Sequence, residues 1–94
     1  MLLDLENLGT IEGVRIELDG CTADGASGAV INNHGAAVDV SIEVFFYDAA
    51  GTQVDSSFAF VNGVRPGGRA NWEAIIFGTE YSTCEAEISS AFES

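Results

Sequence analysis

The chain has 94 residues, a length that corresponds to one domain with a single hydrophobic core. Hydrophobic residues make up 47% of it, which argues against a disordered chain in spite of the charge. Fifteen Asp and Glu stand against three Arg and no Lys, giving a formal net charge of -12, and so few cations argue against nucleic-acid binding.

The acidic residues are spread along the whole chain and form no block. Like charges at this density repel one another in the folded state, and salt weakens the repulsion by shortening the Debye length to about 3 Å at 1 M. The composition therefore indicates a protein adapted to concentrated salt, that is, one from a halophile. The alternative interpretation is an acidic surface made for a basic partner.

Residues 1–10 are expected to form an N-terminal segment, and residues 11–94 the single domain. Leu occupies positions 2, 3, 5 and 8, which fits a short helical turn, an edge strand or a linker remnant. No apolar run approaches the ~18 residues of a membrane span, so we expect no membrane insertion in this chain. A signal peptide or anchor is expected to lie outside it.

Alternation of apolar and charged residues over residues 14–19 predicts a first strand. This strand either ends near Gly20 or continues past a bulge into Cys21. Residues 26–33 predict a weaker second strand, in which Gly28 indicates a bulge or a close neighbour. A turn follows, and we interpret His34, the only histidine, as a residue of that turn.

Residues 37–51 contain the clearest alternation in the chain. One face of an extended strand is apolar and the other is polar; the apolar positions are Val38, Val40, Ile42, Val44 and Phe46. The stretch ends in Asp48 and Gly51, where Asp can hydrogen-bond its own backbone and Gly can take a positive φ. The chain is therefore expected to reverse there and to pair back onto this strand.

Residues 52–62 alternate in the same way, with Val54, Phe58 and Phe60 at even positions, and are expected to pair antiparallel with the preceding strand. The run Arg-Pro-Gly-Gly at residues 65–68 predicts a turn. Because strands recur about every twelve residues without a helical period, the chain is expected to be all-β. The expected fold is an antiparallel β-sandwich whose apolar faces meet, with a small barrel as the alternative.

The last two predicted strands each have one face for the core. Ala70, Trp72, Ala74 and Ile76 share a face, so Trp72 is expected to be buried. Cys84, Ala86 and Ile88 repeat the pattern in the final strand.

Cys21 and Cys84 have no zinc-ligand spacing and are either a disulfide or two buried thiols. We favour a disulfide, which would tie the first strand to the last and indicate an oxidising compartment.

Three blocks of the sequence together resemble a known family: Ala29 to Asn33, Val40 to Gly51, and Val64 to Gly68 with Trp72 to Ala74. The chain resembles the FxLYD-type domain over residues 13–90. The family's Phe-x-Leu-Tyr-Asp run reads Val-Phe-Phe-Tyr-Asp at residues 44–48, so the Tyr-Asp corner matches better than the core positions. The resemblance implies an immunoglobulin-like β-sandwich of six to seven strands in an archaeal or bacterial envelope protein, and the family is frequent in halophilic archaea.

Phe45 and Tyr47 are the candidate contact residues, because they lie on the face opposite Val44 and Phe46. An exposed aromatic pair on a sheet fits a carbohydrate platform or a protein contact. The alternative interpretation is that this end of the strand is covered on both faces.

No motif indicates a catalytic residue, a cofactor or a metal ligand. Acidic pairs such as Glu85 and Glu87 alternate on expected solvent faces, and no calcium-binding loop is present. The sequence therefore predicts a non-catalytic interaction or spacer module, extracellular or in the cell envelope, with an unknown protein or glycan partner. A carbohydrate- or ligand-binding module is the alternative function, and the cytoplasm of a salt-accumulating halophile is the alternative location.

Overall fold

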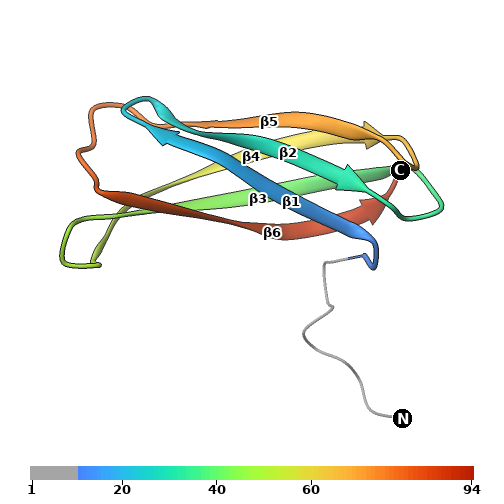
Figure 1. Cartoon of the computed structure of the whole chain (residues 1–94), viewed down its shortest axis with the longest axis horizontal. Coiled ribbons are helices and arrows are strands. Elements are labelled where there is room, and N and C mark those ends of the chain that lie inside the picture. The colour runs from blue at the N-terminus through green and yellow to red at the C-terminus, as the bar shows by residue number, and fades with distance from the viewer. Residues whose placement is uncertain (1–10) are drawn as a thin grey trace, which may run out of the picture.

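The structure is a computed structural model that describes residues 11–94, so the expectations for residues 1–10 lie outside it. The described chain forms six strands and no helix (Figure 1): β1 (Val14–Thr22), β2 (Gly25–Asn32), β3 (Val38–Tyr47), β4 (Gln53–Val64), β5 (Arg69–Ile75) and β6 (Thr83–Glu93). They form two three-stranded antiparallel sheets, sheet A in the order β1-β2-β5 and sheet B in the order β4-β3-β6. The all-β prediction is confirmed. Within residues 11–94 there is no helix long and apolar enough to cross a bilayer.

β3 is the middle strand of sheet B and supplies the centre of the core. Its five alternating apolar side chains are each at most 2% exposed: Val38, Val40, Ile42, Val44 and Phe46. Val30 and Trp72 of sheet A belong to the same buried cluster. The two sheets therefore pack face to face on one core, and the alternation predicted for residues 37–51 is confirmed.

Asp48 forms the reversal between β3 and β4. Its Oδ1 accepts hydrogen bonds from the backbone N–H groups of Ala50 and Thr52, each at 2.9 Å. The N–H of Gly51 donates to the carbonyl of Asp48 at 3.0 Å. β4 then returns antiparallel to β3, so both the predicted turn and the predicted pairing are confirmed.

β4 departs from the expectation that the apolar faces meet in the core. Val54, Phe58 and Phe60 are 41%, 50% and 70% exposed. The register explains this orientation, because Ala59 pairs with the fully buried Ile42 and is itself buried. Successive side chains of a strand point to opposite sides, so the aromatic neighbours of Ala59 point to solvent.

Gly28 lies where β1 and Trp72 both come close to β2. A Cβ added at this position would lie 1.8 Å from the carbonyl oxygen of Glu17 and 2.7 Å from the indole of Trp72. The indole is 3% exposed, and its Nε1–H donates to the carbonyl of Ala29 at 3.2 Å. The expectation of a close neighbour at Gly28 and of a buried Trp72 is confirmed.

A disulfide joins Cys21 of β1 to Cys84 of β6, with the two Cα atoms 6.1 Å apart and a sequence separation of 63. β1 reaches Cys21 by continuing past an irregularity between Leu18 and Gly20. Cys84 is 9% exposed, whereas Cys21 is exposed. The bridge therefore links the two sheets at the edge of the core, and the disulfide prediction is confirmed. Disulfides are typical of oxidising compartments.

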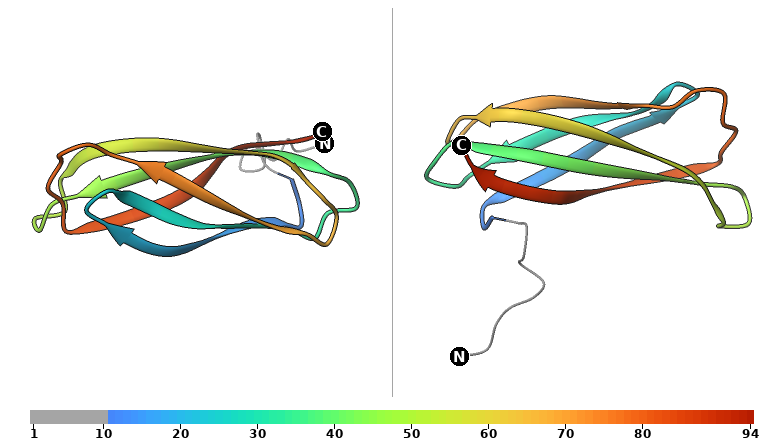
Figure 2. Two further views of the ribbon diagram at one scale, coloured as in Figure 1. Left: turned by 90° about the horizontal axis from the view of Figure 1, so that it is seen from above. Right: turned by 180° about the vertical axis from the view of Figure 1, so that it is seen from behind.

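The turns gather at the two ends of the strands (Figure 2). At one end the fully buried Asn32 organises the chain: its Nδ2 donates to the carbonyls of Ala36 and Val64, and its Oδ1 accepts from the N–H of His34. The backbone of Asn32 also pairs with the turn at residues 65–68. Both turns predicted at this end are confirmed, and His34 lies in the first of them.

Candidate interaction surface

The two predicted contact residues lie on the outer face of sheet B. Phe45 and Tyr47 are both half-buried, and they point away from the core side chains of β3. The Tyr47 hydroxyl donates to Oε2 of Glu85 on β6 at 3.4 Å. Desolvation, and then the nearby negative charge of Glu85, raise the pKa of Tyr47 above its ordinary value.

The same face carries three more aromatic side chains that the sequence did not single out. Phe58 and Phe60 of β4 stack with their ring centroids 6.4 Å apart and their planes 12° apart. Phe92 of β6 is 62% exposed and pairs with Asp39 of β3. The five side chains are called the aromatic face: Phe45, Tyr47, Phe58, Phe60 and Phe92.

The rings on β4 and β3 form a diagonal row. Phe58 pairs with Glu43, whereas Phe45, two residues further along β3, pairs with Ser56. Diagonal neighbours on adjacent strands lie about 7–8 Å apart, within reach of aromatic side chains. Single exposed hydrophobic residues are ordinary on a protein surface, but a continuous row of rings indicates a contact surface.

Carboxylates stand beside the rings of the aromatic face. Glu43 of β3 pairs directly with Glu87 of β6, in the same row as Phe58. Asp39 is held by hydrogen bonds from the hydroxyl of Ser94 and the N–H of Gly63, which lower the pKa of its carboxyl. The face is therefore both aromatic and strongly acidic.

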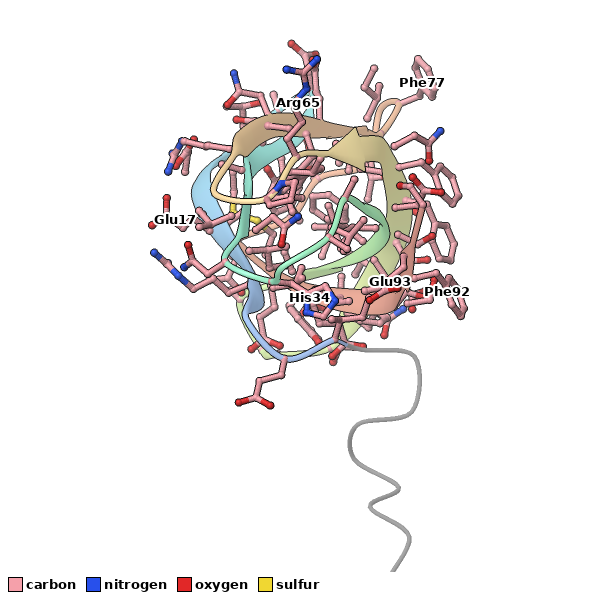
Figure 3. All side chains as sticks on the ribbon, turned by 90° about the vertical axis from the view of Figure 1, so that its right-hand side faces the viewer. Glu17, His34, Arg65, Phe77, Phe92 and Glu93 are labelled. Carbon is pink, nitrogen blue, oxygen red and sulfur yellow. A yellow bond between two sulfur atoms is a disulfide. The ribbon has the colours of Figure 1, made fainter. Side chains whose placement is uncertain are left out.

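The arginines lie away from this face. Arg69 of β5 and Arg15 of β1 contact Glu17 on sheet A at 2.7 Å and 3.3 Å, and Arg65 follows β4 in a turn. Their hydrogen bonds to Glu17, that of Arg69 first, lower the pKa of its carboxyl. Sheet A therefore has two arginines that partly compensate the carboxylates on its outer surface, whereas the outer face of sheet B has no arginine. Glu17 projects on the opposite side of the molecule from Phe92 (Figure 3).

A smaller apolar area adjoins β4 at the end of β5. Phe77 is 89% exposed and Ile75 is 51% exposed. The hydroxyl of Ser57 on β4 donates to the carbonyl of Ile75 at 2.8 Å, which fixes β5 beside β4. Phe77 projects to the same side as Phe92, so the exposed apolar surface extends from sheet B around the edge at β4 (Figure 3).

A hollow of about 510 Å³ lies beside the disulfide, lined by residues of the end of β1, of the β1–β2 turn and of the loop before β6. Tyr81 is part of its wall; the hydroxyl donates to the carbonyls of Thr22 and Gly25, and the ring packs edge-on against Phe46 at 4.8 Å. Burial raises the pKa of Tyr81. Glu80 is the one carboxylate in the lining, so the hollow presents no pair of groups for acid–base chemistry.

In the part of the chain that the structure describes, the remaining titratable groups form no cluster around a second site. His34 contacts Glu93 at 2.7 Å between Nε2 and Oε1, at the end of the molecule opposite the hollow (Figures 1 and 3). Within residues 11–94, no group of three His, Cys, Asp or Glu side chains is placed to hold a metal ion. The surface with the most distinctive chemistry is therefore the aromatic face.

No protein-family model, curated protein or solved structure matches this chain.

Proposed function

We propose that the protein is a non-catalytic interaction module that contacts a protein partner through the aromatic face of sheet B. The observation that carries this proposal is the gathering of five aromatic side chains on one outer sheet face, three of them at least 50% exposed. Exposed apolar surface lowers solubility, so a row of rings on an otherwise acidic protein is best explained by a contact. The hollow beside the disulfide supports no rival catalytic site.

We infer that the fold is an immunoglobulin-like sandwich, as the resemblance to the FxLYD-type domain implies. The sheet orders β1-β2-β5 and β4-β3-β6 correspond to strands A-B-E and C′-C-F of immunoglobulin-like domains. Tyr81 shortly precedes the second cysteine, near the position of the corner tyrosine of those domains, but its hydroxyl bonds to carbonyls of the distant β1–β2 turn and not to its own corner. The disulfide differs, because it joins the A and F positions, whereas antibody domains join B and F.

We further propose an extracellular or envelope setting in a halophile. The disulfide supports the oxidising compartment, and the net charge of -12 supports the saline one. A neutral glycan is a second candidate for the partner, because the exposed rings of Phe58 and Phe60 offer apolar surface to a sugar ring.

Photo-crosslinking in the source organism tests the proposed contact. A benzoylphenylalanine in place of Phe60 is expected to yield a covalent adduct with a partner protein, identified by mass spectrometry. The same group in place of Asn71, which is exposed on sheet A, is the matched control and is expected to yield none. Equal adducts at both positions, or none at position 60, would contradict the proposal.

A further inference from the structure

Glu43 and Glu87 form a pair of like charges on the aromatic face. They are direct partners across the antiparallel strands β3 and β6, and β3 is the middle strand, so both side chains stand on the same outer surface. Like charges directly opposite each other destabilise a sheet. The three arginines lie outside β3 and β6, and no ion pair to Glu43 or Glu87 occurs within residues 11–94. The arrangement is therefore unfavourable until a cation is added.

The surroundings of this pair select the kind of cation. Phe58 pairs with Glu43 from the other side of β3, so an aromatic ring lies in the same row as the two carboxylates. A guanidinium group is planar, bonds two carboxylate oxygens at once and stacks on aromatic rings. An ammonium group is a compact and strongly hydrated charge that cannot stack on a ring as a planar guanidinium does. We therefore expect it to bind more weakly beside the ring and the two carboxylates.

We propose that the aromatic face binds an arginine-bearing segment of a partner protein, with one guanidinium between Glu43 and Glu87 and against the ring of Phe58. This inference rests on the proposed function and specifies the chemistry of the partner. Phe45 and Phe60 flank the row on neighbouring positions and supply apolar contact for the rest of the segment.

Charge also argues against a second copy of the chain as the occupant. Two copies would each bring a net charge of -12 to the contact. Arg15 and Arg69 are engaged with Glu17, which leaves Arg65 as the one arginine for a neighbouring molecule. A basic partner is attracted by the same field that repels a copy.

The first experiment titrates the ¹⁵N-labelled full chain with a Gly-Ser peptide that carries four arginines, at the lowest salt at which the protein is folded. Amide shifts are expected on β3, β4 and β6. The double variant E43Q/E87Q is expected to weaken binding at least tenfold. The control E12Q/E73Q also removes two negative charges, but from exposed sites away from sheet B, and it is expected to weaken binding less than twofold. Equal losses would mean unspecific attraction to an acidic protein and would overturn the proposal.

The second experiment tests the aromatic part of the site. The four-lysine peptide is expected to bind at least threefold more weakly than the four-arginine peptide, and the Phe58→Leu variant is expected to bring this ratio close to one. Phe77→Leu, also an exposed phenylalanine but outside the aromatic face, is the control and should keep the ratio. An arginine preference that survives Phe58→Leu would overturn the stacking geometry.

A stability measurement tests the like-charge pair without any ligand. Glu43→Gln is expected to raise the melting temperature more than Glu73→Gln does, because only the first removes a direct repulsion. An equal or smaller rise would contradict the argument from which the proposal starts.

A neutral oligosaccharide, maltohexaose, separates this inference from the proposed function. If it shifts the amides of β3 and β4 and the arginine peptide does not, the face is a contact surface but its partner is a glycan, and the inference is wrong. If position 60 gives no crosslink in cells, the proposed function itself fails. Self-association of the chain at micromolar concentration, abolished by Arg65→Gln, would instead assign the site to a second copy and overturn the inference.

Discussion

Gly28 is the residue at which sheet A has the least room. Because a Cβ would lie 1.8 Å from the Glu17 carbonyl oxygen and 2.7 Å from the Trp72 indole, β1 and the indole must both move to admit a methyl group. Gly28→Ala is therefore expected to lower the free energy of unfolding by about 3 kcal/mol or more, at the upper end of overpacking effects. Urea denaturation monitored by Trp72 fluorescence measures the loss.

Gly20→Ala is the matched control for this substitution. Gly20 also lies in sheet A, but no atom lies within 4 Å of the position of its added Cβ. The change in unfolding free energy is expected to stay below about 1 kcal/mol. If both variants lose the same stability, close packing at Gly28 is not the cause.

Glu17 gives the protein a pH dependence on the acid side. Hydrogen bonds from Arg69 and Arg15 lower the pKa of Glu17 from its ordinary 4.5, so the folded state binds this proton less tightly than the unfolded chain. The stabilisation is therefore complete above pH 4.5 and is lost as the pH falls through the lowered folded-state pKa. Glu17→Gln should lower the melting temperature at pH 7, and its difference from the wild type should close as the pH falls below the lowered pKa of Glu17.

Glu73→Gln removes the same charge from the same sheet without an arginine partner. It is expected to leave the melting temperature at pH 7 unchanged or slightly higher, because it relieves repulsion in an acidic protein. A pH profile of thermal unfolding for both variants makes the comparison. Identical profiles would show that the arginine pair adds nothing beyond net charge.

At the scale of the strands, the alternation of apolar and polar residues predicted where the strands lie better than it predicted which face of each strand points to the core. In β3 one face is wholly apolar and the other includes Asp39 and Glu43, so only one orientation avoids burying charge. β4 has no such constraint, because Ser57 and Ala59 fill the inner face and leave Phe58 and Phe60 outside. The sequence predicts the strand, whereas its orientation depends on which residue pairs with Ile42.

β6 shows the second limit of sequence reasoning. Its register shifts opposite Ser41 and Ile42, so Ser89 is an extra residue in the ladder. Before the shift even positions such as Ile88 face inward, and after it Ala91 is buried and Phe92 is exposed. Nothing in the local sequence marks the bulge, which explains why one residue of the aromatic face was missed. Phe45 and Tyr47 were found because they alternate with buried neighbours in β3.

The disulfide is the covalent link between the first and last strands. β1 lies beside β6, yet the described ladders do not pair the two strands, so Cys21–Cys84 holds that edge together. Because the bridge spans 63 residues of sequence, its loss is expected to cost about 4 kcal/mol on the chain-entropy account. The double variant Cys21→Ser/Cys84→Ser tests this by urea denaturation.

Reduction of the wild-type protein is the companion measurement. Adding a thiol reductant should shift the wild-type midpoint to that of the double serine variant and leave the variant unmoved. Mass spectrometry shows whether the reductant has opened the bridge. If the bridge is open and the wild-type urea midpoint is unchanged, the two strands stay together without the disulfide.

The charges of the whole molecule are unevenly compensated. Sheet A directs two arginines to one glutamate, while sheet B places Asp39, Glu43, Glu85 and Glu87 on one face without a cation among the described residues. The molecule therefore has a large net negative charge that is partly compensated on sheet A and uncompensated on the outer face of sheet B. We therefore expect the stability of the fold to depend on screening by salt, and the proposed partner to contact the uncompensated face of sheet B.

Salt dependence is the prediction that belongs to the molecule as a whole. At a net charge of -12 the folded state is destabilised by repulsion that reaches about 10 Å in 0.1 M salt and about 3 Å in 1 M. The melting temperature is therefore expected to rise as NaCl increases over this range. The triple variant E12Q/E73Q/E80Q changes the net charge from -12 to the less negative -9 at three exposed sites. Its melting temperature should be higher than that of the wild type at low salt and should rise less with NaCl. If salt stabilised the fold only by strengthening burial of apolar surface, both proteins would show the same slope, and that result would contradict the electrostatic origin.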